Sequence, residues 1–310
     1  MNEEVKISVI IVTYNQQDLL GRCIDSVLFQ NEHLYEIVIC DDHSTDKTWD
    51  VIETYQQNHP DLIRGIRNTQ NLGIFKNFYN GWQSCDGNIA TVMAGDDELL
   101  PDCIDAVYDK LINEKVDCDK ESVSVFGNYI VKTPSGKEII RDNSIVSKCR
   151  KYNSLKLRDI ISNFGTFATR PVFSKFYPIN ENIGLFTDGL WDIQLEKFTQ
   201  KCYHINVNVF VHYTDIGITS KVPLNEQFES YIQYLSKVGE IISLNASDKR
   251  YIKYKQNSLN YTIYPTWMGV IKCVYLYIIS RDLEFGIKNN FSMNDLRLVK
   301  DKVRKIFRDE

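Results

Sequence analysis

Two pairs of adjacent carboxylates are the residues of this sequence best suited to chemistry. Asp41-Asp42 follows the apolar run at 36–40, and Asp96-Asp97 follows the run at 88–93. Adjacent acids are costly to bury unless a cation, a hydrogen-bond donor or water meets them. Mg²⁺ and Mn²⁺ bind one or two carboxylates together with substrate phosphates. The second pair therefore indicates a metal-diphosphate site, although an isolated pair before Pro101 is more often a solvated turn that caps a helix.

The elements that position these acids follow from the hydrophobic pattern of the first hundred residues. Strands are expected at 7–12, 36–40, 62–66 and 88–93, and helices at 19–30, 47–57 and 74–84. Asn15 and Asp46 are expected to cap the first two helices. The alternation predicts βαβ units, with a mostly parallel sheet between two layers of helices. Both acidic pairs then lie at strand ends on one sheet edge, where open α/β sheets bind ligands.

The pattern changes after residue 121. The segments SVSVFGNYIV and KEII flank a Thr-Pro-Ser-Gly turn, which predicts a hairpin or a pair of mixed strands in place of another βαβ unit. Further helices are expected at 154–162 and 188–199, a strand at 202–211, and a mostly helical region from 224 onward.

The composition is that of a folded protein without a basic nucleic-acid-binding surface. The 310 residues include 36 Lys and Arg against 41 Asp and Glu, so the net charge is -5. The eight cysteines are scattered without any Cys-x-x-Cys, which indicates reduced thiols in a cytoplasmic protein. The opening MNEEVKISVI is acidic and too short in apolar length for a signal peptide. We therefore expect a cytoplasmic protein with no nucleic-acid partner.

Four motifs together resemble the nucleotide-binding half of a family 2 glycosyltransferase. They are SVIIVTYN at 8–15, EIVICDDHSTD at 36–46, NLGIFKNFYNG at 71–81 and GDDELLP at 95–101. The resemblance is close over residues 1–115 and loose over the next hundred. It implies an α/β GT-A fold, which is a Rossmann-like, mostly parallel sheet flanked by helices, here with a helical C-terminal appendage. It also implies a nucleotide-diphospho-sugar donor, a Mn²⁺ or Mg²⁺ ion and inversion at the anomeric carbon.

The resemblance also assigns a donor site. Tyr14 resembles the residue that packs on the nucleotide base, and Val12 lines the same strand end. Asp42 resembles the acid that hydrogen-bonds uracil, because a carboxylate accepts the imide N–H that uracil and thymine present. Gly73 is expected to let the backbone approach the donor, while Lys76 is either a phosphate ligand or a solvated helix lysine.

Asp96 and Asp97 occupy the Asp-x-Asp position of the family. By resemblance, Asp97 is the direct metal ligand, and Asp96 meets the ribose or reaches the metal through water. The metal would take up charge that develops on the leaving nucleoside diphosphate. His212 is a weaker candidate for a further ligand, since a lone histidine at a strand end is more often structural. Ser220 is a weaker candidate for a phosphate contact.

An inverting transfer also needs a base that removes the proton of the acceptor hydroxyl. The family places this acid at the start of a helix roughly ninety residues after Asp-x-Asp, where this chain has GLFTDGLWD at 184–192. Asp188 is the candidate base, and Asp192 one turn later is the weaker alternative. Thr187 replaces the first acid of the commoner Glu-Asp pair, and Asp188 could instead serve only as a helix cap. Ser44, Thr45, Phe167 and Trp191 are unranked candidates for the acceptor side.

These assignments predict an inverting, metal-dependent glycosyltransferase. It would move a sugar from a nucleotide-diphospho-sugar, with UDP-sugar expected, to a hydroxyl of a glycan or lipid-linked saccharide in bacterial surface polysaccharide synthesis. The alternatives are a catalytically degenerate nucleotide-binding partner subunit and a nucleotidyltransferase. A nucleotidyltransferase would open with a glycine-rich loop bearing Arg and Lys, whereas this chain has VTYNQQ after its first strand.

The expected organisation is a catalytic domain followed by a helical C-terminal region. Residues 1–222 would form the GT-A domain, with the nucleotide-binding half at 1–115 and the acceptor-side half at 116–222. Residues 223–310 would form the C-terminal region. Its aromatic segment at 260–281 and basic cluster at 300–308 are a candidate contact with the inner face of the cell membrane. Packing against the catalytic domain or a second subunit is an equal alternative, and the sequence leaves the oligomeric state open.

The base assignment generates a direct prediction. Asp188→Asn removes a proton acceptor and leaves the metal site unchanged, so we expect donor binding to persist and sugar transfer to be lost. Donor affinity measured by calorimetry, together with transfer measured on the same preparation, checks this. Transfer at the wild-type rate by the variant would contradict the assignment.

Overall fold

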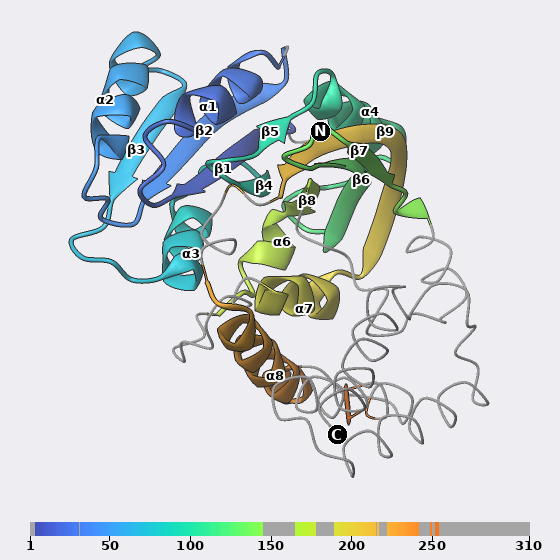
Figure 1. Cartoon of the computed structure of the whole chain (residues 1–310). Coiled ribbons are helices and arrows are strands. Elements are labelled where there is room, and N and C mark those ends of the chain that lie inside the picture. Colours follow the sequence, from blue (N-terminus) through green and yellow to red (C-terminus); the bar gives the residue numbers. More distant parts are fainter. Residues whose placement is uncertain are drawn as a thin grey trace, which may run out of the picture. The chain divides into compact units, whose positions relative to one another are not determined.

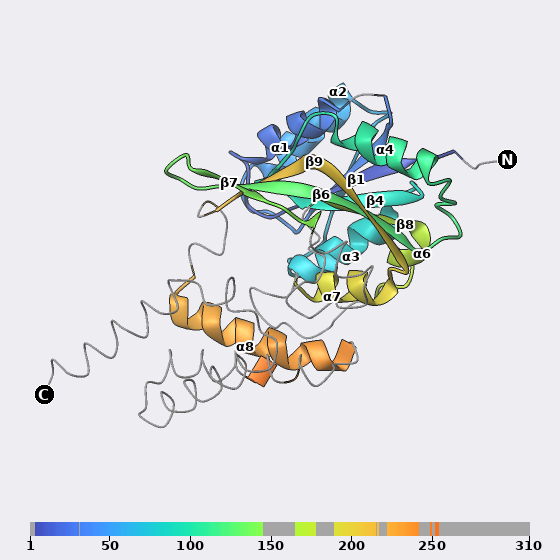
Figure 2. The same cartoon turned by 90° about the vertical axis from the view of Figure 1, so that its right-hand side faces the viewer.

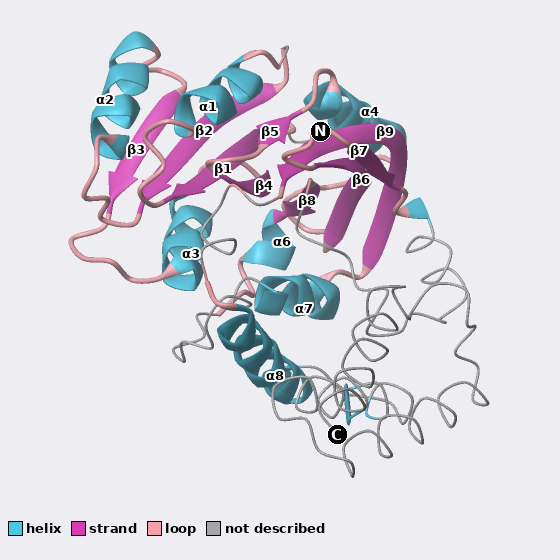
Figure 3. Ribbon diagram, in the orientation of Figure 1, coloured by secondary structure: helices cyan, strands magenta, loops and turns pink. Residues whose placement is uncertain are grey.

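The computed structural model describes residues 4–30, 32–144, 165–177, 189–214, 216, 222–241, 249, 252 and 253. The chain divides into two compact units, Met1–Ser243 and Leu244–Glu310, and the domain boundary expected after residue 222 stays a prediction. The described strands form one nine-stranded sheet (Figure 1, Figure 3). Its order is β3 (Ile63–Arg67), β2 (Leu34–Asp41), β1 (Ile7–Thr13), β4 (Ile89–Ala94), β8 (Thr166–Thr169), β6 (Val123–Lys132), β9 (Lys201–Tyr213) and β5 (Glu98–Leu99), with β7 (Glu138–Arg141) paired to β6.

Strands β3, β2, β1 and β4 form a parallel half-sheet, as the alternating pattern predicts. Every residue of β1 is buried, because its continuous Ile and Val run faces helices on both sides of the sheet. Val12 of β1 pairs with Cys40 of β2 and with Ala94 of β4. The carboxyl ends of the three strands therefore meet at one edge, and both acidic pairs lie there.

Two layers of helices cover the sheet (Figure 1, Figure 2). One face carries α1 (Leu20–Leu28), α2 (Thr48–Asn58) and α4 (Cys103–Asn113), and the other carries α3 (Ile74–Ser84), α6 (Arg170–Phe173) and α7 (Gly189–Phe198), with α8 (Leu224–Ile241) against α7. In α1 the buried residues are Leu20, Cys23, Ile24 and Val27. These are positions that recur every three or four residues, so the predicted amphipathic face is confirmed.

The second half of the sheet is mixed. β6 runs antiparallel to β7 and β8 and parallel to β9, so the predicted hairpin is confirmed. The short elements β5, β8 and α6 leave no periodic pattern in the sequence. β5 consists of two residues and pairs with β9 through Glu98 opposite Val211, a contact made across more than a hundred residues. The helix predicted at 154–162 and the segments at 260–281 and 300–308 lie outside the described residues.

The two capping predictions have different outcomes. The Asp46 carboxylate accepts the backbone N–H of Thr48 at 2.9 Å, at the start of α2, as expected. Asn15 does not cap α1, which begins at Leu20. It adopts a left-handed backbone with φ 51°, and its side-chain oxygen accepts the N–H of Thr45 at 2.8 Å. Asn15 bonds Thr45 instead of α1 because the turn after β1 lies against the turn after β2.

The described part of the chain contains free cysteines and helices of moderate length. The six cysteines that it contains are free thiols, and all except Cys202 are buried. No helix within the described ranges has the length and apolar character needed to cross a membrane.

The close approach of α3 to the sheet generates a stability prediction. A Cβ on Gly81 would meet Cγ2 of Ile10 and lie 3.1 Å from Sγ of Cys40. We expect Gly81→Ala to lower the free energy of unfolding by about 1–3 kcal/mol, since α3 would have to move off the sheet.

Gly21→Ala on α1 is the matched control, because its Cβ would lie 3.4 Å from the Tyr55 hydroxyl oxygen, an ordinary contact. Alanine favours a helix over glycine by about 1 kcal/mol, so this variant should be neutral or slightly stabilised. Denaturant unfolding of both variants checks the difference. Equal stabilities would show that α3 is free to move.

Candidate functional site

The turns after β1 and β2 are joined by hydrogen bonds. Asn15 N–H donates to the Ser44 hydroxyl at 2.9 Å, and Gln16 N–H donates to the Thr48 hydroxyl at 2.8 Å. Tyr14, the predicted base-packing residue, directly follows β1 and is half-buried. These hydrogen bonds thus hold the two turns together at the carboxyl edge of the sheet.

Asp41 has a structural role. Its side chain accepts the N–H of Ser44 at 3.1 Å and the hydroxyl of the same residue, and Arg67 Nε lies 3.3 Å from its second oxygen. Burial raises the pKa of Asp41, and the hydrogen bonds from Ser44 and the charge of Arg67 oppose that rise. These contacts with Ser44 and Arg67 fix the turn in which Asp42 lies. Ser44, a candidate for the acceptor side, is buried in this turn.

Asp42 connects β2 to the loop before α3. It is 3% exposed, and its Oδ1 accepts Asn68 Nδ2 at 2.9 Å and the N–H of Leu72 at 2.8 Å. Its Oδ2 accepts the N–H of Gly73 at 2.9 Å. Gly73 has φ 83°, in the left-handed region that favours glycine. The structure therefore brings the predicted donor residues Asp42 and Gly73 into direct contact, and half-buried Lys76 lies in the first turn of α3.

Asp97 is held against the end of β9. It is 1% exposed, and its Oδ1 accepts the N–H of Tyr213 at 3.1 Å. His212 Nδ1 lies 3.2 Å from Oδ1 and 3.4 Å from Oδ2. Burial, and then the charge of Asp97, raise the pKa of Asp96. Asp96, Asp97 and His212, the candidates for the metal site, thus form one cluster.

A cluster around Arg22 holds this acidic turn, and sequence reasoning missed it. Arg22 on α1 lies 2.7 Å from the Glu98 carboxylate and donates to the Asp96 carbonyl at 2.6 Å. Its guanidinium lies 4.0 Å from the centre of the Tyr213 ring, and the Tyr213 hydroxyl donates to Glu98 at 2.7 Å. Burial, and then the hydrogen bond to Glu98, raise the pKa of Tyr213 to about 12. An exposed helix arginine gives no signal of such contacts, because its partners lie far along the chain.

The donor atoms of the acidic cluster fit a hard divalent ion. Within the described residues, no group of three or more metal-ligating side chains is arranged to hold a metal ion by itself. By donor chemistry alone, the adjacent carboxylates of Asp96 and Asp97 are ligands that Mn²⁺ or Mg²⁺ takes together with phosphate oxygens. Burial, and then the charge of Asp97, raise the pKa of Asp96, and a bound cation would offset both costs.

The candidate bases are only partly described. Asp188 and Ser220 lie outside the described residues. Asp192 is half-buried in the first turn of α7. Tyr129 on β6 has a pKa raised mainly by burial, with the charge of Asp192 adding to the rise. Asp192 is thus electrostatically coupled to the mixed half of the sheet.

Comparison with known proteins identifies the family. Residues 8–172 match the model of Glycosyl transferase family 2. The chain belongs to this family. It is 22% identical over 240 residues to glycosyltransferase GlyA of Streptococcus pneumoniae, covering 75% of this chain and 34% of that protein. It is 29% identical over 150 residues to a GalNAc(5)-diNAcBac-PP-undecaprenol beta-1,3-glucosyltransferase of Campylobacter jejuni, covering 46% of each. The chain thus spans a third to a half of these two relatives.

Solved structures share the fold of this chain. S. aureus TarS 1-349 in complex with UDP-GlcNAc matches with a TM-score of 0.60 and 13% identity, over 88% of this chain and 79% of that one. The mannosyltransferase PcManGT from Pyrobaculum calidifontis, in complex with GDP-Man and Mn²⁺, matches with a TM-score of 0.55 and 14% identity, over 98% and 88%. The predicted α/β GT-A fold of this family 2 chain is confirmed.

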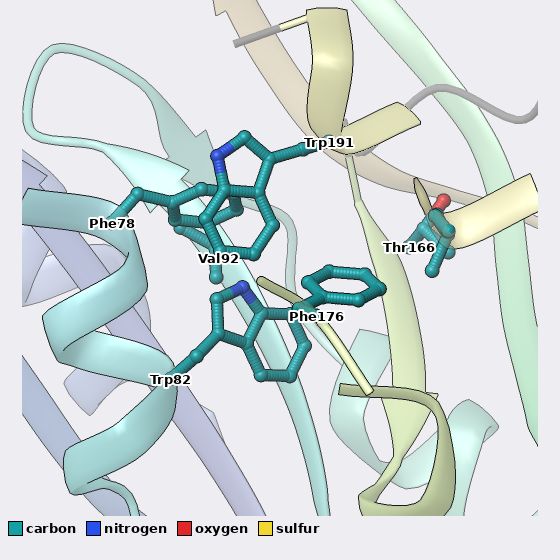
Figure 4. A pocket seen from close by; sticks show the side chains of 7 residues that line it. Phe78, Trp82, Val92, Thr166, Phe176 and Trp191 are labelled. Atoms are coloured by element: carbon teal, nitrogen blue, oxygen red, sulfur yellow. The ribbon is translucent and has the colours of Figure 1, made fainter. Parts of the chain in front are cut away.

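Two aromatic candidates for the acceptor side belong to the core of this family 2 chain. Phe167 is 0% exposed and Trp191 is 1% exposed, and a role for either on the acceptor side stays a prediction. Trp191 of α7 packs with Trp82 of α3, with ring centres 6.2 Å apart, and with Phe176 at 4.8 Å. Figure 4 shows these rings around a pocket at which α3 and α7 meet. The helices bury the rings because each presents an aromatic face to the other.

The raised pKa of Asp96 generates a prediction for the family 2 chain without metal. Above both pKa values the folded state bears the cost of a half-buried charge beside Asp97, so Asp96→Asn should raise the melting temperature near neutral pH. As the pH falls through the raised folded-state pKa, folded Asp96 binds its proton before unfolded Asp96 does. The cost then disappears, and the advantage of the variant should shrink.

Thermal unfolding of both proteins at about pH 7.5 and about pH 5, without divalent ions, checks this. Asp61→Asn is the control, because Asp61 is exposed in the turn before β3. It should leave the melting temperature unchanged at each pH. A lower melting temperature for Asp96→Asn near neutral pH would contradict the prediction.

Proposed function

We propose that this chain is an inverting, metal-dependent glycosyltransferase that uses a UDP-sugar. One observation carries the proposal. A buried carboxylate with a remaining acceptor site, Asp42, and a cluster suited to a metal-diphosphate, around Asp97, lie on the same edge of the sheet. Parallel α/β sheets bind their ligands beyond the carboxyl ends of their strands. The base end and the diphosphate end of a nucleotide would therefore lie over β2 and β4.

The hydrogen bonds of Asp42 favour uracil. An ionised carboxylate has about four acceptor positions, two on each oxygen. Oδ1 already accepts from Asn68 and Leu72, and Oδ2 accepts only from Gly73. One position therefore remains on Oδ2, which matches the single imide N–H of uracil or thymine. Guanine presents two neighbouring N–H groups and would need both oxygens. This supports a uridine nucleotide here, although the solved PcManGT complex contains GDP-Man.

The diphosphate would lie beside Asp97. Asp97, with Asp96 and His212, would hold Mn²⁺ or Mg²⁺, and Lys76 and Ser220 are the further phosphate candidates. When bound, the ion supplies positive charge at the departing diphosphate. The chain orients the cluster through the Tyr213 N–H and through Arg22, which holds the acidic turn. The Mn²⁺ in the PcManGT complex supports the choice of ion.

Proton removal is assigned to Asp188. It immediately precedes α7, which begins at Gly189. Its carboxylate would accept the proton of the acceptor hydroxyl as that oxygen attacks the anomeric carbon opposite the leaving diphosphate. This geometry inverts the anomeric configuration. Asp192, one turn further along α7, is the alternative base.

The acceptor is proposed to be a hydroxyl of a glycan or lipid-linked saccharide in bacterial surface polysaccharide synthesis. The name of the Campylobacter jejuni relative specifies an undecaprenol-linked acceptor, and that supports the lipid-linked form. The enzyme would then act in the cytoplasm, at the inner face of the membrane, with residues 223–310 as the contact. Residues 1–222 would be the catalytic domain.

The proposal is tested by calorimetric binding of UDP, GDP and dTDP with and without Mn²⁺. We expect UDP to bind in the presence of Mn²⁺, and GDP to bind at least about tenfold more weakly, since it would leave one donor unpaired at Asp42. Asp97→Asn should weaken Mn²⁺-dependent UDP binding at least about tenfold, through the loss of a charged ligand.

Asp50→Asn is the control for that variant, because Asp50 is an exposed acid in the first turn of α2. It should bind UDP like the wild type. GDP binding as tight as UDP binding would contradict the uracil assignment. Absence of binding to all three nucleotides by a folded protein would favour the degenerate partner subunit.

A further inference from the structure

We propose that Asn68 is a positioning residue for base selection, because it orients the Asp42 carboxylate that faces the nucleotide. The inference rests on the proposed binding of a uridine nucleotide. Asn68 directly follows β3, the edge strand beside β2, and is 8% exposed. Its backbone N–H donates to the Asp41 carbonyl at 2.9 Å, so the end of β3 holds it against the acidic turn.

The orientation of the Asn68 amide follows from its neighbours. Asn77 Nδ2 donates to the Cys40 carbonyl at 2.8 Å, and a carbonyl can only accept. The Asn77 oxygen therefore faces Asn68 and needs a donor, which is Asn68 Nδ2 at 2.9 Å. The same Nδ2 has a second hydrogen and donates it to Asp42 Oδ1 at 2.9 Å. Asn80 Nδ2 donates to the side-chain oxygen Oδ1 of Asn68 at 3.0 Å. Only one assignment of oxygen and nitrogen satisfies all four bonds.

This network fixes what Asp42 can offer a ligand. α3 supplies Asn77 and Asn80, and the loop before it supplies the N–H groups of Leu72 and Gly73. With two donors on Oδ1 and one on Oδ2, the carboxylate plane has one orientation and one open acceptor position. Without the Asn68 amide, Oδ1 keeps only the Leu72 N–H and Oδ2 only the Gly73 N–H. The carboxylate plane can then tilt about these two bonds, and the open position on Oδ1 can accept from other groups. The directional preference for the single N–H of uracil should then be lost.

The experiment compares UDP with UDP methylated at uracil N3, using the full chain, Mn²⁺ and calorimetry. The methyl group removes the N–H that would meet Asp42, so the wild type should bind the methylated nucleotide at least about tenfold more weakly. In Asn68→Ala we expect UDP affinity to fall and the methylated nucleotide to change little. The ratio of the two affinities should drop below about threefold. A residue that only supports the fold would weaken both ligands equally and leave the ratio unchanged.

Asn88→Ala is the matched control. Asn88 is also a buried asparagine, and its side chain accepts the Lys6 N–H at 2.9 Å and donates to Asp119 at 3.0 Å. It directly precedes β4, whereas the acidic turn Asp96-Asp97 follows the other end of that strand. Its loss should lower stability and keep the wild-type ratio. A wild-type ratio in Asn68→Ala would overturn the inference.

A milder variant covers the case in which Asn68→Ala does not fold. Asn80→Ala removes only the bond to the Asn68 oxygen, and Asn80 is half-buried on α3. We expect the ratio of UDP affinity to methylated-UDP affinity in this variant to be smaller than in the wild type but greater than one. An unchanged ratio would again overturn the inference. If the wild type binds neither nucleotide, or binds both equally, the proposed function fails, and this outcome differs from failure at Asn68.

Discussion

The burial of carboxylates at the carboxyl edge of the parallel half-sheet is the constraint on which the site depends. Asp41, Asp42 and Asp97 are all buried, and a buried charge is tolerated only with hydrogen-bond donors or an opposite charge close by. The donors come from other elements, such as the Gly73 N–H before α3 and the Tyr213 N–H at the end of β9. Satisfying these acids therefore joins turns that are distant in sequence into one surface.

The two acidic pairs meet this constraint in different ways. The first pair is supplied with neutral donors and Arg67, so that Asp41 shapes the turn and Asp42 keeps one position open. In the second pair, Asp97 accepts the Tyr213 N–H and lies against His212. The pKa of Asp96 is instead raised by burial and by the charge of Asp97. Such a pair lowers the stability of the chain without ligands and favours binding of a cation. Stability is thus reduced at the place where the proposed metal would bind.

The mixed half of the sheet completes the site. β9 runs beside β6, and its end brings His212 and Tyr213 to the acidic turn. There the Arg22 guanidinium of α1 lies over the Tyr213 ring and donates to the Asp96 carbonyl. On the other face, the aromatic contacts of Trp191 connect α3, which follows the Asp42 loop, to α7, which follows Asp188. These contacts couple the proposed nucleotide side to the proposed base.

The sequence by itself determined the parallel half-sheet, the ends of its strands and the position of both acidic pairs. These features depend on local patterns, namely apolar runs, helical spacing and short motifs. Only the tertiary structure decided that the Asn68 amide bonds Asp42, that Arg22 bonds the acidic turn and that Trp191 is a core residue. The physical reason is that hydrogen bonds and burial between residues far apart in the chain produce no periodic signal, and they exist only once the strands are packed side by side.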